Sequence, residues 1–212
     1  MKDIPVFTTE NGVASLFLRD IPYRGIGRIK LLSSQCPEAL LQECVEFCRM
    51  CGAEKIHASG HECLKAYTHV ADILEMRGNA DAIGQTDAML FPLQEERAQE
   101  WCKIANEKLS KVDNAAYISL EEAKKVAREG LGYYIHKDGK LLGIGQVGES
   151  SIELVVSLVC GGGCHIVRAL SQLLPEDDIS LQVASTNYKA IKLYESLGFF
   201  TVNVISSWYK II

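Results

Sequence analysis

Long runs of basic residues and apolar segments of membrane-spanning length are both missing from this sequence. The chain has 22 basic and 27 acidic residues among 212, for a formal net charge of −5. Extended binding to nucleic acid by phosphate neutralisation is therefore not expected. No apolar run reaches the roughly 20 residues of a spanning helix, so we expect no membrane association. The charged start, Met1-Lys-Asp-Ile-Pro5, does not have the pattern of a secretory signal.

The cysteines also occur without secretory features or a regular metal-binding pattern. We interpret the eight cysteines as reduced thiols of a cytoplasmic protein. Cys48-Arg-Met-Cys51 is a C-x-x-C pair, but it falls at the end of a predicted helix, whereas redox pairs occupy helix N-termini. The sequence has neither a second C-x-x-C nor a regular histidine spacing, so we expect no metal site.

From residue 87 onward the sequence shows a clear order of strands and helices. Strands are predicted at 87–93, 132–136, 140–147, 152–159, 180–184 and 199–204. Helices are predicted at 95–112, from the capping box Ser119-Leu-Glu-Glu122 to Gly130, after Gly161-Gly-Gly163 as far as Pro175, and at 187–197. Lys137-Asp-Gly139 is typical of a hairpin turn. The order is β-α-α-β-β-β-α-β-α-β-β, with two strands expected after the last helix, of which 199–204 is the first.

The most informative segment is 187–199, N-Y-K-A-I-K-L-Y-E-S-L-G-F. Asn187 can cap a helix, and Gly198 can end it in the left-handed conformation. The segment resembles the last third of the GNAT-type N-acetyltransferases, whose N-x-x-A-x-x-L-Y-x-x-x-G-F signature is met at every fixed position. The resemblance covers roughly residues 87–212. It implies the GNAT acyl-CoA N-acyltransferase fold, an α+β (α/β) fold with a mixed central sheet flanked by helices.

The first 86 residues predict a smaller α+β domain. Strand-like runs occur at 5–8, 13–19, 28–32, 55–58 and 71–76, and a helix is predicted at 37–51. This pattern resembles the core of the same fold without its two early helices. A degenerate second copy, or half-copy, is one interpretation, and an unrelated small cap is the other. We therefore predict two domains, 1–86 and 87–212.

The resemblance implies that acetyl-CoA binds where a central strand opens into a glycine-rich loop at a helix N-terminus. Free N–H groups and the helix dipole suit a pyrophosphate there. The family pattern V-x-x-x-x-[QR]-x-x-G-x-G falls on Val155, Cys160, Gly163 and His165, so Cys160 and His165 depart from it. The basic residues that are usual in this loop are also absent, which implies modest affinity, although protonated His165 could add positive charge.

Roles for individual residues follow from the same resemblance. The backbone of Glu153, Leu154 and Val155 is expected to pair with the pantetheine arm. The phosphates are expected to lie against the backbone of Gly161, Gly162, Gly163, Cys164, His165 and Ile166. The alternative is a glycine-rich turn that binds nothing.

Acetyl transfer to an amine needs a neutral nucleophile and protonation of the departing thiolate. By the resemblance, Tyr194 protonates the thiolate, and Asn187 both caps its helix and offers its amide to the cofactor. The alternative for Tyr194 is a core tyrosine. Many relatives have L-E-V in the strand before the Asn, whereas this chain has Leu181-Gln182-Val183, and an amide cannot accept a proton at neutral pH. Glu153 is the substitute base if it faces the substrate cleft. The alternative is an edge-facing solvated carboxylate, and a third possibility is that water takes the proton with no dedicated residue.

The sequence therefore predicts an enzyme, an acetyl-CoA-dependent N-acetyltransferase acting on a primary amine of a small molecule or peptide. The alternative is a catalytically weak or inactive acyl-CoA-binding module of the same fold. We consider a homodimer as its assembly.

Overall fold

The structure, a computed structural model, describes residues 2–112, 115–175 and 177–212. The chain divides into two compact units, the first formed by residues up to Ile73 together with Ile205–Ile212, and the second by Leu74–Val204. Two long strands, β5 (Thr68–Asn79) and β11 (Phe200–Lys210), contribute residues to both. These compact units have other boundaries than the predicted domains 1–86 and 87–212, and that division into domains stays a prediction.

The first unit is a small sheet with one long helix against it. Its strands have the order β1-β2-β3-β4-β11, with β1 (Ile4–Thr9), β2 (Gly12–Phe17), β3 (Ile26–Ser34) and β4 (Lys55–Ser59). Helix α2 (Pro37–Met50) joins the parallel strands β3 and β4. Its buried face is Leu40, Leu41, Cys44, Val45 and Cys48. The sequence prediction missed two short elements, α1 (Ile21–Arg24) and the 3-10 helix η1 (Glu62–Ala66).

The last residues of the chain complete this first unit. Tyr209 pairs with Ala58 and Lys210 with His57 in an antiparallel ladder between β11 and β4. The Ile211 N–H then donates to the Ile56 carbonyl at 2.8 Å. Tyr209, Ile211 and Ile212 pack against the same apolar cluster as the fully buried Ile56. The C-terminal segment therefore adds a strand to the sheet of the N-terminal unit, next to β4.

Removal of residues 209–212 is expected to lower the unfolding free energy of the first unit by about 3 kcal/mol, because apolar side chains and ladder hydrogen bonds are lost together. Amide hydrogen exchange should show faster exchange in β4 and α2 and unchanged exchange in β7–β9. Lys210→Ala, which alters only an exposed side chain of the same segment, is the control. Equal protection of β4 in the truncated and full chains would contradict this role.

The second unit has the strand order β11-β5-β10-β9-β8-β7-β6. Its strands are β6 (Met89–Pro92), β7 (Gly132–Lys137), β8 (Lys140–Val147), β9 (Ser151–Ser157) and β10 (Asp178–Ala184). Its helices are α3 (Ala80–Ile83), η2 (Glu95–Arg97), α4 (Ala98–Leu109), α5 (Leu120–Arg128), α6 (Gly162–Ser171) and α7 (Tyr188–Ser196). The sheet is mixed, as predicted: β9 and β10 are parallel, whereas β6 to β9 are antiparallel.

Most predicted elements of this unit are confirmed within a few residues. The capping box of α5 is present, since Ser119 accepts from the Glu122 N–H and the Glu122 side chain accepts from the Ser119 N–H. Two predictions need correction. Helix α6 ends at Ser171 rather than near Pro175, which leaves Leu173 40% exposed. A single strand, β11, replaces the two strands expected at the end.

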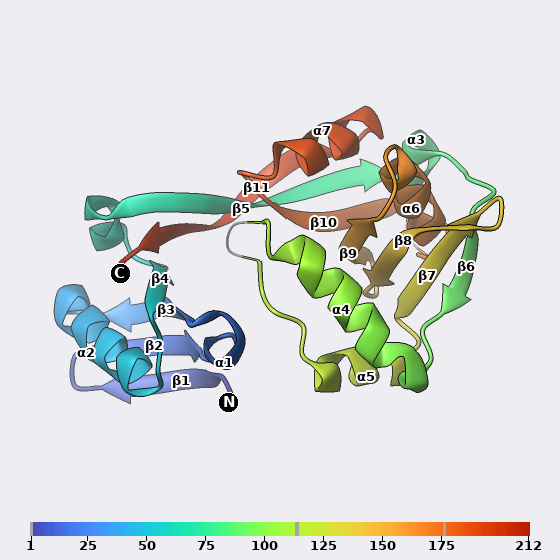
Figure 1. The fold of residues 1–212 in the computed structure, drawn as a ribbon. Helices are drawn as coiled ribbons and strands as arrows, with labels where there is room; N and C mark the ends of the chain where they lie inside the picture. The colour runs from blue at the N-terminus through green and yellow to red at the C-terminus, as the bar shows by residue number, and fades with distance from the viewer. Residues whose placement is uncertain (1, 113–114, 176) are drawn as a thin grey trace. The chain divides into compact units, whose positions relative to one another are not determined.

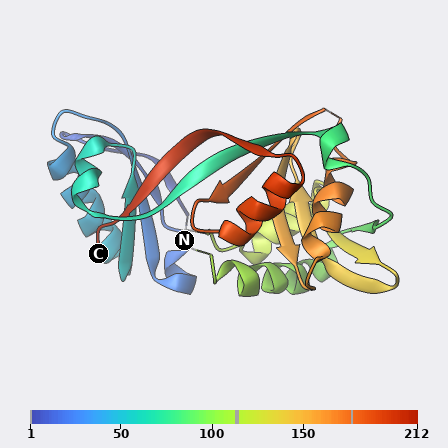
Figure 2. The ribbon, with the colours of Figure 1, turned by 90° about the horizontal axis from the view of Figure 1, so that it is seen from above.

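Helices cover both faces of this second sheet (Figures 1 and 2). One apolar cluster joins α6 and α7 to the sheet and includes Ile166, Leu170, Tyr194 and Phe199. A second cluster joins α4 and α5 to the other face through Trp101, Ala123 and Val156. The central strands β8 and β9 are therefore fixed from both sides by buried packing.

The two units share a topology but differ in one ladder. Each has three antiparallel strands followed by a helix and a parallel strand: β1-β2-β3-α2-β4 and β7-β8-β9-α6-β10. In the first unit the parallel ladder runs without interruption from Ile26 with Lys55 to Lys30 with Ser59. In the second, the ladder between described residues comprises only Ser151 with Ser180 and Ile152 with Leu181. That the first unit is a degenerate copy stays a prediction.

Candidate active site

A β-bulge in β9 lies where the parallel ladder ends. Gln146 of β8 pairs with Leu154, but the next residue, Val147, pairs with Ile152. Glu153 is therefore the extra residue of the bulge. A bulge bends its strand and increases the local twist. It thus accounts for the separation of β9 from β10 immediately after Ile152.

This separation leaves one edge of β9 open. Residues Leu154–Ser157 remain paired to β8 on one side, through the pairs from Gln146–Leu154 to Gly143–Ser157. On the side of β10, the ladder between described residues stops at Ile152. Backbone N–H and C=O groups on an open edge can form main-chain hydrogen bonds with an extended ligand. The edge leads directly toward the N-terminus of α6.

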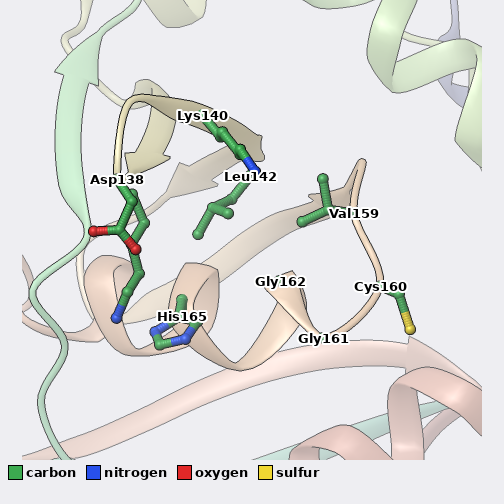
Figure 3. Close-up of a pocket in the computed structure, with 9 residues that line it drawn as sticks. Asp138, Lys140, Leu142, Val159, Cys160, Gly161, Gly162 and His165 are labelled. Atoms are coloured by element: carbon green, nitrogen blue, oxygen red, sulfur yellow. The ribbon is translucent and has the colours of Figure 1, made fainter.

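A cavity of about 510 Å³ lies at that helix N-terminus. Its lining comes from the loop before α6 and from the turn between β7 and β8: Lys137, Asp138, Lys140, Leu142, Val159, Cys160, Gly161, Gly162 and His165. Figure 3 shows Lys140 and Leu142 on one side of this space, with Gly161, Gly162 and His165 on the other. The cavity therefore combines a helix N-terminus, where the Gly162 N–H already donates to the Val159 carbonyl at 3.2 Å, with nearby cationic side chains, which suits an anion.

The glycines of the loop have different roles. Gly161 caps α6 with φ of 76°, a left-handed conformation that favours glycine, and no atom lies within 4 Å of its Cβ position. A Cβ on Gly162 would lie 2.8 Å from Val159 Cγ2, and one on Gly163 would lie 2.7 Å from Leu193 Cδ2. Gly162 and Gly163 therefore permit close packing, whereas Gly161 leaves its backbone open to a ligand.

Two lysines reach the cavity from the hairpin turn. Lys137 lies 2.5 Å from a carboxylate oxygen of Asp87. The hydrogen bond from Lys137 lowers the pKa of Asp87, and the same bond raises the pKa of Lys137. Lys140 forms no ion pair with any residue that the structure describes. Of the two lysine ammonium groups at the cavity, that of Lys140 has no carboxylate partner among the described residues.

His165 is fixed at the wall of the cavity. Its Nδ1 lies 2.8 Å from Thr86 Oγ1, in the segment between α3 and β6. Thr86 Oγ1 also accepts from the Ala88 N–H at 3.3 Å. The His165 side chain lines the cavity without closing it. The departure from the glycine pattern at this position therefore leaves the space intact.

Helix α7 packs against the start of α6 and carries Asn187 and Tyr194. Asn187 caps α7, as predicted, by accepting from the Ala190 N–H at 3.3 Å. Gly198 follows the helix with φ of 88°, and Phe199 packs onto Gly78 of β5, whose added Cβ would lie 2.9 Å from its ring. The Phe199 and Tyr194 ring centroids are 5.9 Å apart. The G-F end of the segment thereby fixes the ring of Tyr194.

Tyr194 is 7% exposed, and burial raises the pKa of its phenol to about 12. Its hydroxyl has no hydrogen-bond partner among the described residues. The side chain therefore stays protonated at neutral pH, and its hydroxyl can donate a hydrogen bond to a ligand.

Comparisons with known proteins support one fold. Neither a protein-family model nor a curated protein matches the chain. Among solved structures, a GNAT-family acetyltransferase from Colwellia psychrerythraea is 14% identical, with a TM-score of 0.56 over 97% of this chain and 84% of that one. A putative acetyltransferase from Pyrococcus horikoshii is 14% identical, with a TM-score of 0.62 over 95% of this chain and 69% of that one. A functionally unknown protein from Staphylococcus epidermidis is 11% identical, with a TM-score of 0.60 over 96% and 91%.

This chain has the GNAT acetyltransferase fold. The fold predicted from the 187–199 segment is thereby confirmed. At identities this low, the similarity establishes the fold, and the reaction has to be argued from the site itself.

The structure places the residues predicted for a GNAT cofactor site in three groups. Gly161, Gly162 and His165 line the cavity; Leu154 and Val155 lie on the open edge of β9. Cys164 lies in the first turn of α6, where its thiol is 3.1 Å from the Gly161 carbonyl oxygen. Ile166 is fully buried, and Gly163 packs beneath Leu193. Their roles toward a ligand stay predictions.

Sequence reasoning missed the two lysines. They were visible as the residues flanking the D-G turn, but nothing in their spacing places that turn beside the loop before α6. The antiparallel pairing of β8 with β9 does so, because the Leu158 N–H donates to the Leu142 carbonyl at 2.8 Å, beyond the last ladder pair. The start of β8 thus lies next to the end of β9.

Glu153 is exposed at the bulge, and Ser151 Oγ donates a hydrogen bond to its carboxylate. It is a solvated carboxylate rather than a charge enclosed in an apolar strand, and its role as the base stays a prediction. Gln182 is also exposed, between the buried Leu181 and Val183. Of these two side chains, only Glu153 has a carboxylate, and it lies where β9 and β10 separate.

Two further observations bear on other kinds of function. Over the residues that the structure describes, no group of three or more His, Cys, Asp or Glu side chains could hold a metal ion. In the same part of the chain, the search for a helix with the length and apolarity of a membrane span finds none.

The raised pKa of Tyr194 makes stability depend on pH in the alkaline range. Because ionisation is disfavoured in the folded state, the stabilisation is complete below the usual phenol pKa of about 10 and is lost as pH rises through about 12. Between these values, the unfolding free energy of the wild type should fall about 2–3 kcal/mol further than that of Tyr194→Phe. Urea titrations at several pH values measure this. If the unfolding free energies of the wild type and Tyr194→Phe changed equally with pH, the pKa of Tyr194 would not be raised by folding.

Proposed function

We propose that this protein is an acetyl-CoA-dependent N-acetyltransferase that transfers acetyl to a primary amine of a small molecule or peptide. The observation that carries the proposal is the open edge of β9, which begins at the Glu153 bulge and leads to the cavity at the N-terminus of α6. An extended pantetheine arm could pair with this edge as an added strand would. Its pyrophosphate would then meet the N–H groups of α6.

The cofactor site belongs to the second unit in this proposal. In the first unit, the corresponding strands β3 and β4 stay paired from Ile26–Lys55 to Lys30–Ser59, so that part of β3 is not open to a ligand. A backbone whose hydrogen bonds are already made within the sheet has none to offer to a pantetheine arm. We therefore assign one acetyl-CoA to each chain.

Transfer of acetyl from a thioester to an amine forms a C–N bond and breaks a C–S bond, so the nitrogen loses a proton and the sulfur gains one. We assign the group facing the sulfur to Tyr194, whose phenol is protonated and unpaired among the described residues. With a pKa of about 12, this phenol is a weaker acid than an ordinary thiol, of pKa about 8.5. Tyr194 therefore acts mainly by donating a hydrogen bond to the developing thiolate, which takes its proton from water as CoA leaves.

We assign the removal of the amine proton to Glu153. Gln182 cannot accept a proton at neutral pH, and Glu153 is an exposed carboxylate on the bulge where the two strands separate. The hydrogen bond from Ser151 orients its carboxylate. A base at this place would act on an amine that approaches between β9 and β10.

The alternative function is a GNAT-fold module that binds acyl-CoA without transferring the acyl group. Gln182, in place of the glutamate that is common in the family, favours it, because the strand beside the opening then carries no base. The eight cysteines, all free in the structure, support a cytoplasmic location for either function. We keep a homodimer as the proposed assembly.

The proposed function is tested by thermal melting with and without acetyl-CoA, followed by free-thiol release against a panel of amines. The proposal predicts a raised melting temperature and amine-dependent thiol release. A stabilised protein that releases no thiol with any amine would favour the binding module. A melting temperature unmoved by millimolar acetyl-CoA would contradict both.

Tyr194→Phe is expected to lower kcat about a hundredfold while leaving the Kd of acetyl-CoA nearly unchanged, because only a donor to the leaving sulfur is removed. Steady-state kinetics and calorimetric titration measure the two quantities. Phe199→Leu, a neighbour in the same cluster that carries no hydroxyl, is the control for altered packing. A variant that binds weakly but turns over at the wild-type rate would remove the assigned role.

Glu153→Gln is expected to lower kcat/KM about a hundredfold at neutral pH, because the amide keeps the shape of the side chain but accepts no proton. Glu149→Gln, an exposed glutamate in the adjacent turn, is the matched control and should change kcat/KM little. Equal rates in the two variants would mean that water takes the proton.

A further inference from the structure

The glycine-rich loop itself carries no cation, yet the cavity that it lines contains ammonium groups. Cys160 stands at the position where a basic or amide side chain is expected, and residues 160–164 include no Lys or Arg. Lys137 and Lys140 come instead from the turn between β7 and β8. The positive charge at the cavity is therefore carried by the β7–β8 hairpin and not by the glycine-rich loop.

The two lysines differ in what they can offer to a ligand. The ammonium of Lys137 is paired with Asp87 at 2.5 Å, so much of its charge is already neutralised. Lys140 has no ion-pair partner among the described residues, and its side chain is exposed. Asp138 is the acidic residue of the cavity lining, and Figure 3 shows its carboxylate and the Lys140 ammonium pointing in opposite directions from the turn. Lys140 is therefore the cation still available.

The position of Lys140 is fixed by the sheet. It begins β8, and Leu142, two residues later, accepts the Leu158 N–H at 2.8 Å. Leu142 also lines the cavity, as does Val159 across from it. Leu142 belongs to one apolar cluster and Ile144 to the other, so packing on both faces holds β8 from two residues after Lys140 onward. The lysine stem can swing, but its base cannot leave the rim of the cavity.

We propose that Lys140 supplies the charge that the loop lacks and holds a phosphate group of the acyl donor, across the cavity from the N–H groups of α6. This inference rests on the proposed acetyl-CoA site and deepens it. On this inference, the acyl donor is a thioester of a carrier that contains a nucleotide phosphate, as CoA does. Short thioesters that end at pantetheine lack this phosphate and would be poor donors. The shared chemistry is a phosphate oxyanion, which could belong to the diphosphate or to the 3′-phosphate of CoA.

The test compares Lys140→Gln with Lys103→Gln, an exposed lysine on α4 that does not line the cavity. Calorimetric titrations use CoA, 3′-dephospho-CoA and inorganic pyrophosphate, after melting curves have shown that both variants are folded. Lys140→Gln should raise the Kd of CoA about tenfold, the size expected for one charge-assisted contact. The effect should shrink between about 50 mM and about 0.5 M salt, because the ammonium is exposed. Lys103→Gln should bind as the wild type does.

The titrations also identify the phosphate. If Lys140→Gln weakens binding of 3′-dephospho-CoA as much as that of CoA, the lysine holds the diphosphate. If the variant no longer matters for 3′-dephospho-CoA, the lysine holds the 3′-phosphate. Both results support the proposal, whereas equal Kd values for CoA in Lys140→Gln and Lys103→Gln would overturn it.

Pyrophosphate separates this inference from the proposed function. If wild-type protein fails to bind CoA but binds pyrophosphate in a way that depends on Lys140, the anion site stands and the acetyltransferase assignment fails. If the wild type binds neither CoA nor pyrophosphate, or binds only pyrophosphate and binds it equally in Lys140→Gln, the anion site is overturned as well.

Discussion

The bulge at Glu153 is the constraint on which the rest of the site depends. One extra residue in β9, between its pairings with Val147 and Gln146 of β8, bends the strand where its ladder with β10 stops. The first unit has a bulge too, at Leu32 of β3, because Val13 pairs with Ser33 and Ala14 with Leu31. Its parallel ladder with β4 ends at Lys30, just before that bulge. In β9 the bulge comes only two residues after the strand begins, so more of the strand lies beyond the ladder.

Buried packing holds this opening in place. Strands β8 and β9 lie between two apolar clusters, one through α6 and α7 and the other through α4 and α5. Glycines at tight contacts let the layers approach: a Cβ on Gly143 would lie 2.0 Å from the Val156 carbonyl oxygen, and one on Gly145 would lie 2.5 Å from Leu170 Cδ1. Gly143 and Gly145 of β8 therefore serve close packing of the sheet and of α6. The same rigidity positions Lys140, Gly161 and His165 around one cavity.

Local signals in the sequence predicted much of this structure, and non-local pairing accounts for what they missed. The capping box at Ser119, the cap at Asn187 and the left-handed Gly198 depend on neighbouring residues and were correctly predicted. The bulge and the hairpin lysines depend on the register between strands, which no single segment encodes. The C-terminal strand of the first unit was missed for the same reason, since its partner β4 lies about 150 residues earlier.

The central claim, that the open edge of β9 and the start of α6 receive an acyl-CoA, is tested most directly by amide hydrogen exchange with and without acetyl-CoA. The account predicts slower exchange in residues 153–157 and 161–166 when acetyl-CoA is present, and no change in the corresponding strand β3 of the first unit. Unchanged exchange in β9 and α6 at saturating acetyl-CoA, or protection confined to the first unit, would contradict it.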